Sequence, residues 1–184
     1  TLHEQDALEL ELATLLPDSP KVRVVGNLPY NISTPLLFHL CDQIDRIQDM
    51  HFMLQKEVVE RMAAGPGSKT YGRLSVMMQY HVQVVPLFVV KPGSFNPPPK
   101  VNSAIVRLKP YKTQPYNIGD YALFRKIVAQ SFSHRRKTLR NALNGTIDAT
   151  ELTSLGLDPS CRPETLQGND FGKISSYLSS KRTS

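Results

Sequence analysis

Apolar segments alternate between strand-like and helix-like spacing through the N-terminal half of the chain. The valine-rich segment 21–25 and the apolar segment 50–55 are typical of short buried strands, because β-branched and large apolar side chains fit a pleated surface. Apolar residues at helical spacing predict helices over residues 8–16, 33–41 and 57–64. This alternation of strands and helices indicates a parallel α/β sheet.

A second set of elements follows the glycine- and proline-rich turn at residues 65–67. Residues 71–81 predict a helix and residues 82–90 a strand. Residues 103–109 alternate between apolar and polar side chains, a pattern typical of an edge strand with one solvated face. Pro86 lies inside the strand at 82–90. Because proline cannot donate a hydrogen bond to a neighbouring strand, we expect a bulge or break there.

The pattern becomes purely helical after a linker-like segment at residues 112–115. Apolar and aromatic residues at helical spacing predict helices over residues 121–132, 152–157 and 171–178. The chain therefore predicts an α/β part followed by a small all-α part.

Basic residues are concentrated in the C-terminal half, although the whole chain carries a formal charge of only +6. Residues 1–90 contain 7 Lys and Arg against 10 Asp and Glu, whereas residues 91–184 contain 15 against 6. Residues 131–143 read as a basic helix with Leu139 and Leu143 toward the core. Its outer face either binds a polyanion or is simply solvated. The cations of this face are Arg135, Arg136, Lys137 and Arg140.

Several classes of protein are disfavoured by the composition. No segment of 18 apolar residues is present, so no transmembrane helix is predicted. Cys41 and Cys161 lie far apart without metal-ligand spacing, which is typical of reduced thiols in a cytosolic protein. We therefore expect a cytoplasmic protein with no metal site and no membrane contact.

The segment Asn27–Tyr30, directly after the strand at 21–25, combines the groups needed to hold an amino-bearing base. The aromatic ring of Tyr30 can stack on a base. The amide oxygen of Asn27 and the backbone carbonyl of Leu28, fixed by Pro29, can accept both amino hydrogens. Such acceptors would leave the nitrogen lone pair free to attack a methyl donor. The alternative is a strand-to-turn connection with Pro29 in the turn and Tyr30 in the core.

A proline-rich segment at residues 92–103 contains three consecutive prolines after Phe95. Consecutive prolines form a stiff, extended backbone with little conformational entropy left to lose. The segment would therefore hold the Phe95 ring in a fixed place. That ring either faces a ligand or fills the core beneath a rigid loop.

Asn27–Tyr30, followed by Asn31–Pro35, resembles the tetrad of the ribosomal RNA adenine N6,N6-dimethyltransferases, and most closely that of their bacterial small-subunit (16S) branch. The resemblance covers essentially the whole chain. It implies a Rossmann-like methyltransferase domain over residues 1–112, whose parallel strands are joined by an antiparallel edge strand. It also implies a helical RNA-binding domain over residues 113–184.

The resemblance also assigns roles to single residues. In the family, the aromatic residue of the tetrad and that of the proline-rich loop face each other across the target base, which would make Tyr30 and Phe95 a clamp. An acidic residue of the family binds the adenine of S-adenosylmethionine, and Asp6 matches it; a helix N-cap is the alternative role of Asp6. The implied catalytic residues are Asn27, Leu28, Pro29, Tyr30 and Phe95; the cofactor-binding residues are Asp6, Ala7 and Asn27; the RNA-binding residues are Lys100, Arg135, Arg136, Lys137 and Arg140.

The implied reaction is the dimethylation of two adjacent adenines of 16S ribosomal RNA in the small ribosomal subunit, by a monomer that uses S-adenosylmethionine and no metal. One alternative is a non-catalytic RNA-binding ribosome assembly factor. Another is a large-subunit ribosomal RNA adenine methyltransferase, whose tetrad is usually Asn-Ile-Pro-Tyr. Gly26 is the first glycine, so no glycine-rich cofactor turn precedes the tetrad. We therefore expect a fragment of a longer enzyme, inactive and without useful cofactor affinity by itself.

Overall fold

The computed structural model describes residues 2–18, 20–134 and 136–183. The chain forms two compact units. The sheet unit contains residues 1–63 and 81–112, and the helical unit contains residues 64–80 and 113–184. Residues 64–80 thus fold with the helical unit, whereas the functional division between residues 112 and 113 stays a prediction.

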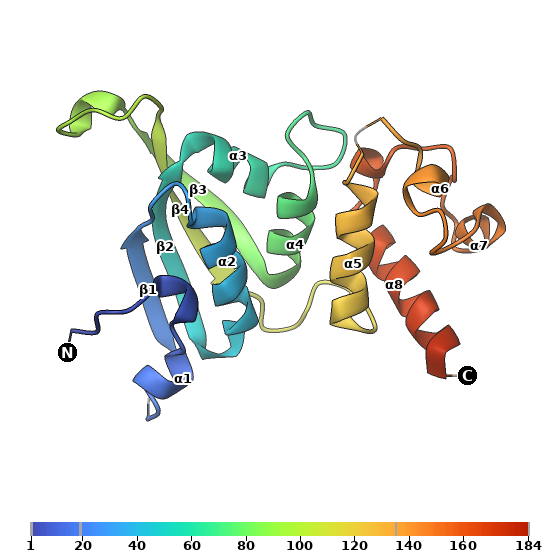
Figure 1. Ribbon diagram of the computed structural model, residues 1–184, viewed down its shortest axis with the longest axis horizontal. Helices are drawn as coiled ribbons and strands as arrows, with labels where there is room; N and C mark the ends of the chain where they lie inside the picture. The colour runs from blue at the N-terminus through green and yellow to red at the C-terminus, as the bar shows by residue number, and fades with distance from the viewer. Residues whose placement is uncertain (1, 19, 135, 184) are drawn as a thin grey trace. The chain divides into compact units, whose positions relative to one another are not determined.

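The sheet unit contains a mixed four-stranded sheet in the order β1-β2-β4-β3 (Figure 1). Strands β1 and β2 are parallel, and β4 is antiparallel to both of its neighbours. The α/β class is therefore confirmed, but β4 is an interior strand and not the expected edge strand. Its alternating pattern has a different origin, because Val106 and Leu108 are fully buried while Arg107 reaches the opposite face. The strands are β1 (Val22–Asn27), β2 (Ile47–Gln55), β3 (Val82–Val90) and β4 (Ser103–Pro110).

Strand β3 lies at an edge of the sheet and carries the predicted irregularity. Its register with β4 shifts between Pro86 and Phe88. An edge position accommodates Pro86, because a strand there needs ladder hydrogen bonds on one side only. Phe88, which follows the shift, is 62% exposed.

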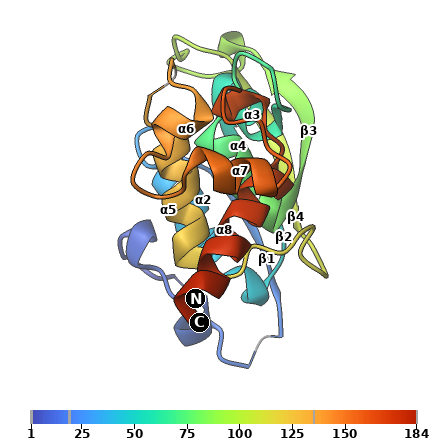
Figure 2. The same cartoon turned by 90° about the vertical axis from the view of Figure 1, so that its right-hand side faces the viewer.

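Helices α2 (Ser33–Asp42) and α3 (Lys56–Ala63) lie on the same side of this sheet (Figures 1 and 2). Both begin close to the predicted residues, and the apolar stripe predicted for each is buried. The core between helices and sheet is built from aliphatic side chains, methionine and one phenylalanine. Its members include Leu37, Leu40, Met50, Phe52, Leu54, Met62, Val106 and Leu108.

The prediction of a single helix over residues 8–16 is wrong. The segment forms a short 3-10 helix η1 (Ala7–Glu9) and one turn of helix α1 (Leu12–Leu15). The Gln43 side chain explains the break, because its Nε2 donates to the Leu10 carbonyl and its Oε1 accepts from the Leu12 N–H, at 2.8 and 2.7 Å. These bonds replace the backbone partners that a continuous helix would have used.

The helical unit is held together by α5 (Tyr121–Ser131) and α8 (Gly168–Thr183), which pack against each other (Figure 2). The helices expected over residues 121–132 and 171–178 are present as α5 and α8, although α8 is longer than predicted. The helix expected over residues 152–157 begins and ends three residues earlier than predicted. Gly172 allows segment 116–117 to approach α8, because an added Cβ would lie 2.6 Å from the Asn117 carbonyl oxygen. The other elements are α4 (Arg73–His81), whose last residue belongs to the sheet unit, α6 (Leu139–Ala142), α7 (Ala149–Ser154) and the 3-10 helix η4 (Pro163–Thr165).

Cys41 and Cys161 are both free thiols. Burial raises the pKa of the Cys41 thiol to about 12, so this side chain stays protonated in the core. Across the part of the chain that the structure describes, no helix combines the length and apolar character required to cross a membrane.

Candidate functional site

The tetrad Asn27–Tyr30 begins where β1 ends. Asn27 is the last residue of β1 and its side chain is exposed. The buried Leu28 donates its backbone N–H to the Met53 carbonyl of β2 at 3.2 Å. The chain thus leaves the sheet at the carboxyl ends of two parallel strands, which is the end where α/β sheets bind ligands.

The backbone of the tetrad is fixed by a tight turn into α2. The Ile32 N–H donates to the Pro29 carbonyl at 3.2 Å, and the Ser33 hydroxyl donates to the Tyr30 carbonyl at 3.1 Å. Within the described residues, neither the Asn27 side chain nor the Leu28 carbonyl takes part in a hydrogen bond. Two acceptors next to each other in the chain are therefore available to a ligand.

The Tyr30 ring is attached to the sheet through its hydroxyl. Its Oη lies 2.9 Å from the Oγ of Ser103, the first residue of β4. Ser103 is 1% exposed, whereas Tyr30 is 39% exposed. The hydrogen bond therefore holds the polar end of the ring and leaves part of the ring accessible. Tyr30 is not a core residue, which removes one reason for interpreting the tetrad as a simple turn.

Phe95 lies in the connection between β3 and β4. The connection starts with the 3-10 helix η3 (Pro92–Ser94), and the Phe95 N–H donates to the Pro92 carbonyl at 3.1 Å. Phe95 is half-buried. At the base of the loop Val90 pairs with Ser103, the hydrogen-bond partner of Tyr30. The loop is therefore anchored beside Tyr30, while a clamp between the two rings stays a prediction.

Asp6 forms the N-cap of η1, and its Oδ1 accepts from the Leu8 N–H at 2.9 Å. The N-cap role is thus present in the structure. The carboxylate is exposed, and within the described residues its other oxygen makes no hydrogen bond. Ala7 is the first residue of η1. Asp6 can therefore cap η1 and still accept from a ligand.

The basic stretch is not the continuous helix that we expected. Helix α5 ends at Ser131 and α6 begins at Leu139, because Leu139 donates its N–H to the Cys161 carbonyl at 2.8 Å instead of continuing a helix from α5. The division of its side chains is as predicted, since Leu139 and Leu143 are buried. Arg136, Lys137, Arg140 and the loop residue Lys100 are exposed, whereas Arg135 lies outside the described residues.

A charged cluster on the sheet was not predicted from the sequence. Asp49 of β2 is 3% exposed and accepts from Arg23 Nε and Nη2 of β1 at 2.6 and 2.9 Å. Arg107 Nη2 of β4 lies 3.5 Å from the same carboxylate. The hydrogen bonds from Arg23 are the main cause that lowers the pKa of Asp49. Only the pairing of Arg23 with Asp49 in the sheet register brings these residues together.

Comparison with known proteins connects this geometry to one family. The family model for ribosomal RNA adenine dimethylase matches residues 1–179. A Ribosomal RNA small subunit methyltransferase A from Pseudomonas syringae pv. syringae is 56% identical over 180 residues, which are 98% of this chain and 67% of that protein. The protein of the same name from Proteus mirabilis is 52% identical over 183 residues, 99% of this chain and 67% of that protein.

Solved structures show the same relationship. A dimethyladenosine transferase from Plasmodium falciparum matches with a TM-score of 0.80 and 28% identity, over 98% of this chain and 72% of that chain. The 23S rRNA methyltransferase ErmE matches with a TM-score of 0.66 over 94% of this chain and 69% of that chain. At 19% identity, the second likeness concerns the fold alone.

Proposed function

The chain belongs to the ribosomal RNA adenine dimethylase family, and we propose that it forms the base-binding part of an enzyme that dimethylates N6 of two adjacent adenines in 16S ribosomal RNA. Relatives named for small-subunit ribosomal RNA methylation support this target. The observation that carries the proposal is the pair of open acceptors, Asn27 and the Leu28 carbonyl, beside the accessible ring of Tyr30.

The two acceptors explain how the amino group becomes a nucleophile. S-adenosylmethionine supplies the electrophilic methyl group. The Asn27 amide oxygen and the Leu28 carbonyl accept the two amino hydrogens of adenine, which keeps the N6 lone pair out of the ring. As the new carbon–nitrogen bond forms, the carbon–sulfur bond breaks with its electron pair on sulfur, and the proton leaves to water. After two transfers no amino hydrogen remains, so the acceptors no longer hold the base and the product is released.

Two residues of the N-terminal segment suit the methyl donor together with Asn27 of the tetrad. Asp6 has an oxygen open to accept from the amino group of the donor's adenine, and Ala7 and Asn27 complete the contacts that we propose. The chemistry requires no metal ion, because the sulfonium is already a good leaving group. All of these assignments rest on the family relationship together with the open hydrogen-bonding groups.

The RNA must present its adenine outside the base stack, as for other enzymes that act on a base. Tyr30 and Phe95 would hold the unstacked base by stacking on both of its faces. The exposed cations Lys100, Arg136, Lys137 and Arg140, together with Arg135, would contact phosphates. We place this activity in the cytoplasm and assign it to a monomer.

Methylation assays that offer each ribosomal subunit separately to the full-length protein test this proposal. We expect transfer of four methyl groups to two adjacent adenines of the small subunit, and none to the large subunit. Transfer to the large subunit alone would instead support a large-subunit methyltransferase. RNA binding without transfer to either subunit would support a non-catalytic assembly factor.

A further inference from the structure

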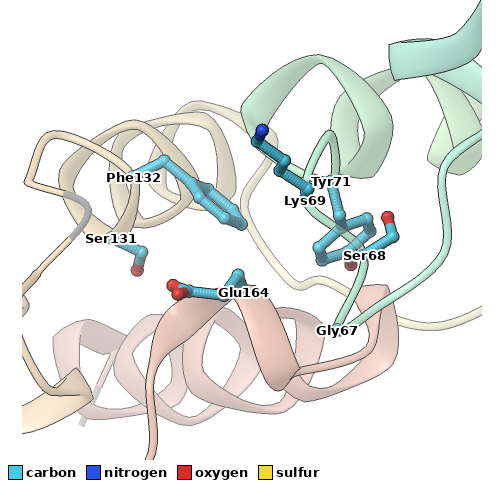
Figure 3. Close-up of a pocket in the computed structure, with 7 residues that line it drawn as sticks. All are labelled: Gly67, Ser68, Lys69, Tyr71, Ser131, Phe132 and Glu164. Carbon is cyan, nitrogen blue, oxygen red and sulfur yellow. The ribbon is translucent and has the colours of Figure 1, made fainter.

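A small hollow lies in the helical unit, where the end of α5 meets segment 67–71 and η4 (Figure 3). Its volume is about 130 Å³. Pockets for drug-sized ligands hold roughly 300–1,000 Å³, so this hollow suits one small group. It belongs entirely to the helical unit and is separate from the tetrad.

Ser131, the last residue of α5, gives the hollow an unused polar group. Its side chain is 1% exposed, yet within the described residues its hydroxyl has no hydrogen-bond partner. A buried hydroxyl without a partner is costly, so native proteins nearly always supply one. Ser131 and Glu164 both line the hollow (Figure 3). A ligand between the two groups would satisfy the hydroxyl.

Glu164 presents a carboxylate at the same place. Its backbone carbonyl accepts from the Gly67 N–H at 2.7 Å, which fixes η4 against the turn at residues 65–67. Its side chain is 31% exposed, and its ion pair with Arg162 is loose at 3.9 Å. An ionised carboxylate accepts hydrogen bonds only. The hollow therefore favours a ligand with two neighbouring N–H donors.

Aromatic rings form another wall of the hollow. Phe132 is half-buried and packs edge-on against Tyr71, with ring centroids 6.0 Å apart at 79°. The centroids of the Phe132 and Phe171 rings lie 5.6 Å apart. The Tyr71 hydroxyl donates to the Leu166 carbonyl at 3.0 Å, which holds Tyr71 in place. A rigid phenylalanine at the edge of a small hollow favours a planar ligand that can stack on it.

The surroundings favour a ligand with an anionic backbone. Lys69 lines the hollow and is exposed at its rim. Arg136 and Lys137 follow Phe132 within five residues and are also exposed. Cations around a site for one planar group are typical of proteins that stack an unpaired RNA base and contact its phosphates.

We propose that this hollow binds one unstacked guanine of the RNA substrate. The Glu164 carboxylate would accept from guanine N1–H and its 2-amino group, and the Ser131 hydroxyl would donate to O6. Phe132 would stack on the ring, and Lys69 would face the phosphate. Adenine has an acceptor where guanine has N1–H, so adenine would place a lone pair against the carboxylate. The inference that the ligand is RNA rests on the proposed function, whereas the selectivity for guanine rests on the hollow.

Nuclear magnetic resonance titration of the chain with mononucleotides tests the guanine site without any methyl transfer. We expect GMP to shift the amide signals of Gly67, Ser131 and Phe132 in a saturable way. IMP lacks the 2-amino group and should bind about tenfold more weakly, which is the loss expected for one hydrogen bond to a charged group. AMP should cause no saturable shift at these amides. Equal binding of GMP, IMP and AMP would overturn the selectivity.

Two conservative variants and one control give the test its specificity. Glu164→Gln should remove the preference for GMP over AMP, because the amide no longer offers two acceptors. Ser131→Ala should weaken GMP binding while leaving the melting temperature unchanged or higher, since among the described residues the hydroxyl has no partner to lose. Glu57→Gln, the control, replaces an exposed acid of the sheet unit and should leave the binding of GMP and AMP unchanged. Unchanged GMP affinity in both Glu164→Gln and Ser131→Ala would show that the hollow holds only water.

Other outcomes separate this inference from the proposed function. Saturable binding of N-acetylarginine amide in place of GMP would mean that the carboxylate takes a peptide side chain, and would overturn the base site. If GMP binds but no ribosomal RNA is methylated, the proposed function fails and the guanine site stands. If methylation proceeds normally in Glu164→Gln and GMP does not bind the parent chain, the guanine site fails and the proposed function stands.

Discussion

The Tyr30 hydroxyl lies 2.9 Å from Ser103 Oγ, and the two residues are 73 positions apart in the sequence. Ser103 belongs to an interior strand, where it pairs with Gln55 on one side and Val90 on the other. A residue held by both neighbouring strands is a firm support for the ring of Tyr30. Ser103 is therefore a positioning residue for the tetrad, acting through Tyr30 and not on the base.

Replacing Ser103 by Ala should lower kcat/KM for RNA methylation about threefold to tenfold, the effect of losing one hydrogen bond. Tyr30→Phe should have a similar effect, and the double variant should be no worse than either single variant, because both remove the same bond. Ser103→Thr should restore most of the activity. Ser94→Ala, at an exposed serine of η3, is the matched control. Additive effects of Ser103→Ala and Tyr30→Phe would contradict this role of Ser103.

Variants of the two proposed stacking residues, Tyr30 and Phe95, should behave differently from variants of Ser103, which only positions Tyr30. Tyr30→Ala and Phe95→Ala each remove a ring, and stacking on one base contributes about 1–3 kcal/mol. We therefore expect RNA affinity to fall by about fivefold to a hundredfold in each variant. Fluorescence of 2-aminopurine placed at the target adenine measures the stacking directly. A Phe95→Ala variant that quenches 2-aminopurine as strongly as the parent protein would exclude Phe95 from the clamp.

Part of the site could be predicted from sequence because its signals are local. The valines of β1 and the turn at Pro29 locate the tetrad at the end of a strand. The bond between Tyr30 and Ser103 could not be predicted, because it depends on the order of the strands. The interior place of β4 was missed for the same reason, since alternation along a strand says nothing about its neighbours.

The wrong prediction of one helix over residues 8–16 has another cause, because a distant side chain takes hydrogen bonds that the helix backbone would have made. The apolar spacing of residues 8–16 fits a helix, but Gln43 takes the Leu10 carbonyl and the Leu12 N–H. Gln43 is distant from both of these residues in the sequence. Its effect appears only when α2 is packed against the N-terminal segment. The Arg23–Asp49 pair was missed in the same way, because strand register alone brings the two residues together.

The exposed cations of the helical unit should act on RNA without regard to sequence. Reversing Arg136, Lys137 and Arg140 to Glu should weaken binding to every RNA tested. The slope of log K against log salt should fall by about 0.7–0.9 for each phosphate that the variant no longer neutralises. The matched control reverses the exposed lysines Lys21, Lys109 and Lys112. Unchanged affinity and slope in the first variant would identify this surface as simply solvated.

The buried carboxylate of Asp49 should make the stability of the chain dependent on acid pH. Its pKa in the folded chain is lowered from the usual 3.8, mainly by Arg23. The stability that this pair contributes is therefore fully present at a pH above the usual pKa of 3.8. It is lost as the pH falls through the lower pKa that Asp49 has in the folded chain. Asp49→Asn should reduce the free energy of unfolding by about 2 kcal/mol at neutral pH, less than for a fully buried pair because Arg23 is 55% exposed.

Urea unfolding between pH 7 and pH 2 measures the contribution of Asp49. The parent chain should lose more stability than Asp49→Asn over this range, because the variant has no carboxyl group to protonate at this position. Asp45→Asn, at an exposed acid of the 3-10 helix η2 (Ile44–Arg46), should behave like the parent. Identical pH profiles for the parent and Asp49→Asn would contradict the coupling between Asp49 and Arg23.

The most direct test of whether the tetrad activates the adenine amino group uses the full-length Asn27→Ala variant. Its methyl transfer to small ribosomal subunits and its RNA affinity are measured on the same samples. Asn27 ends β1 with an exposed side chain, so its removal should leave the fold intact. We predict that Asn27→Ala binds small subunits as the parent protein does but transfers no detectable methyl group to adenine N6. Near-normal turnover by this variant would contradict the proposed mechanism, because the amino group would then be activated without Asn27.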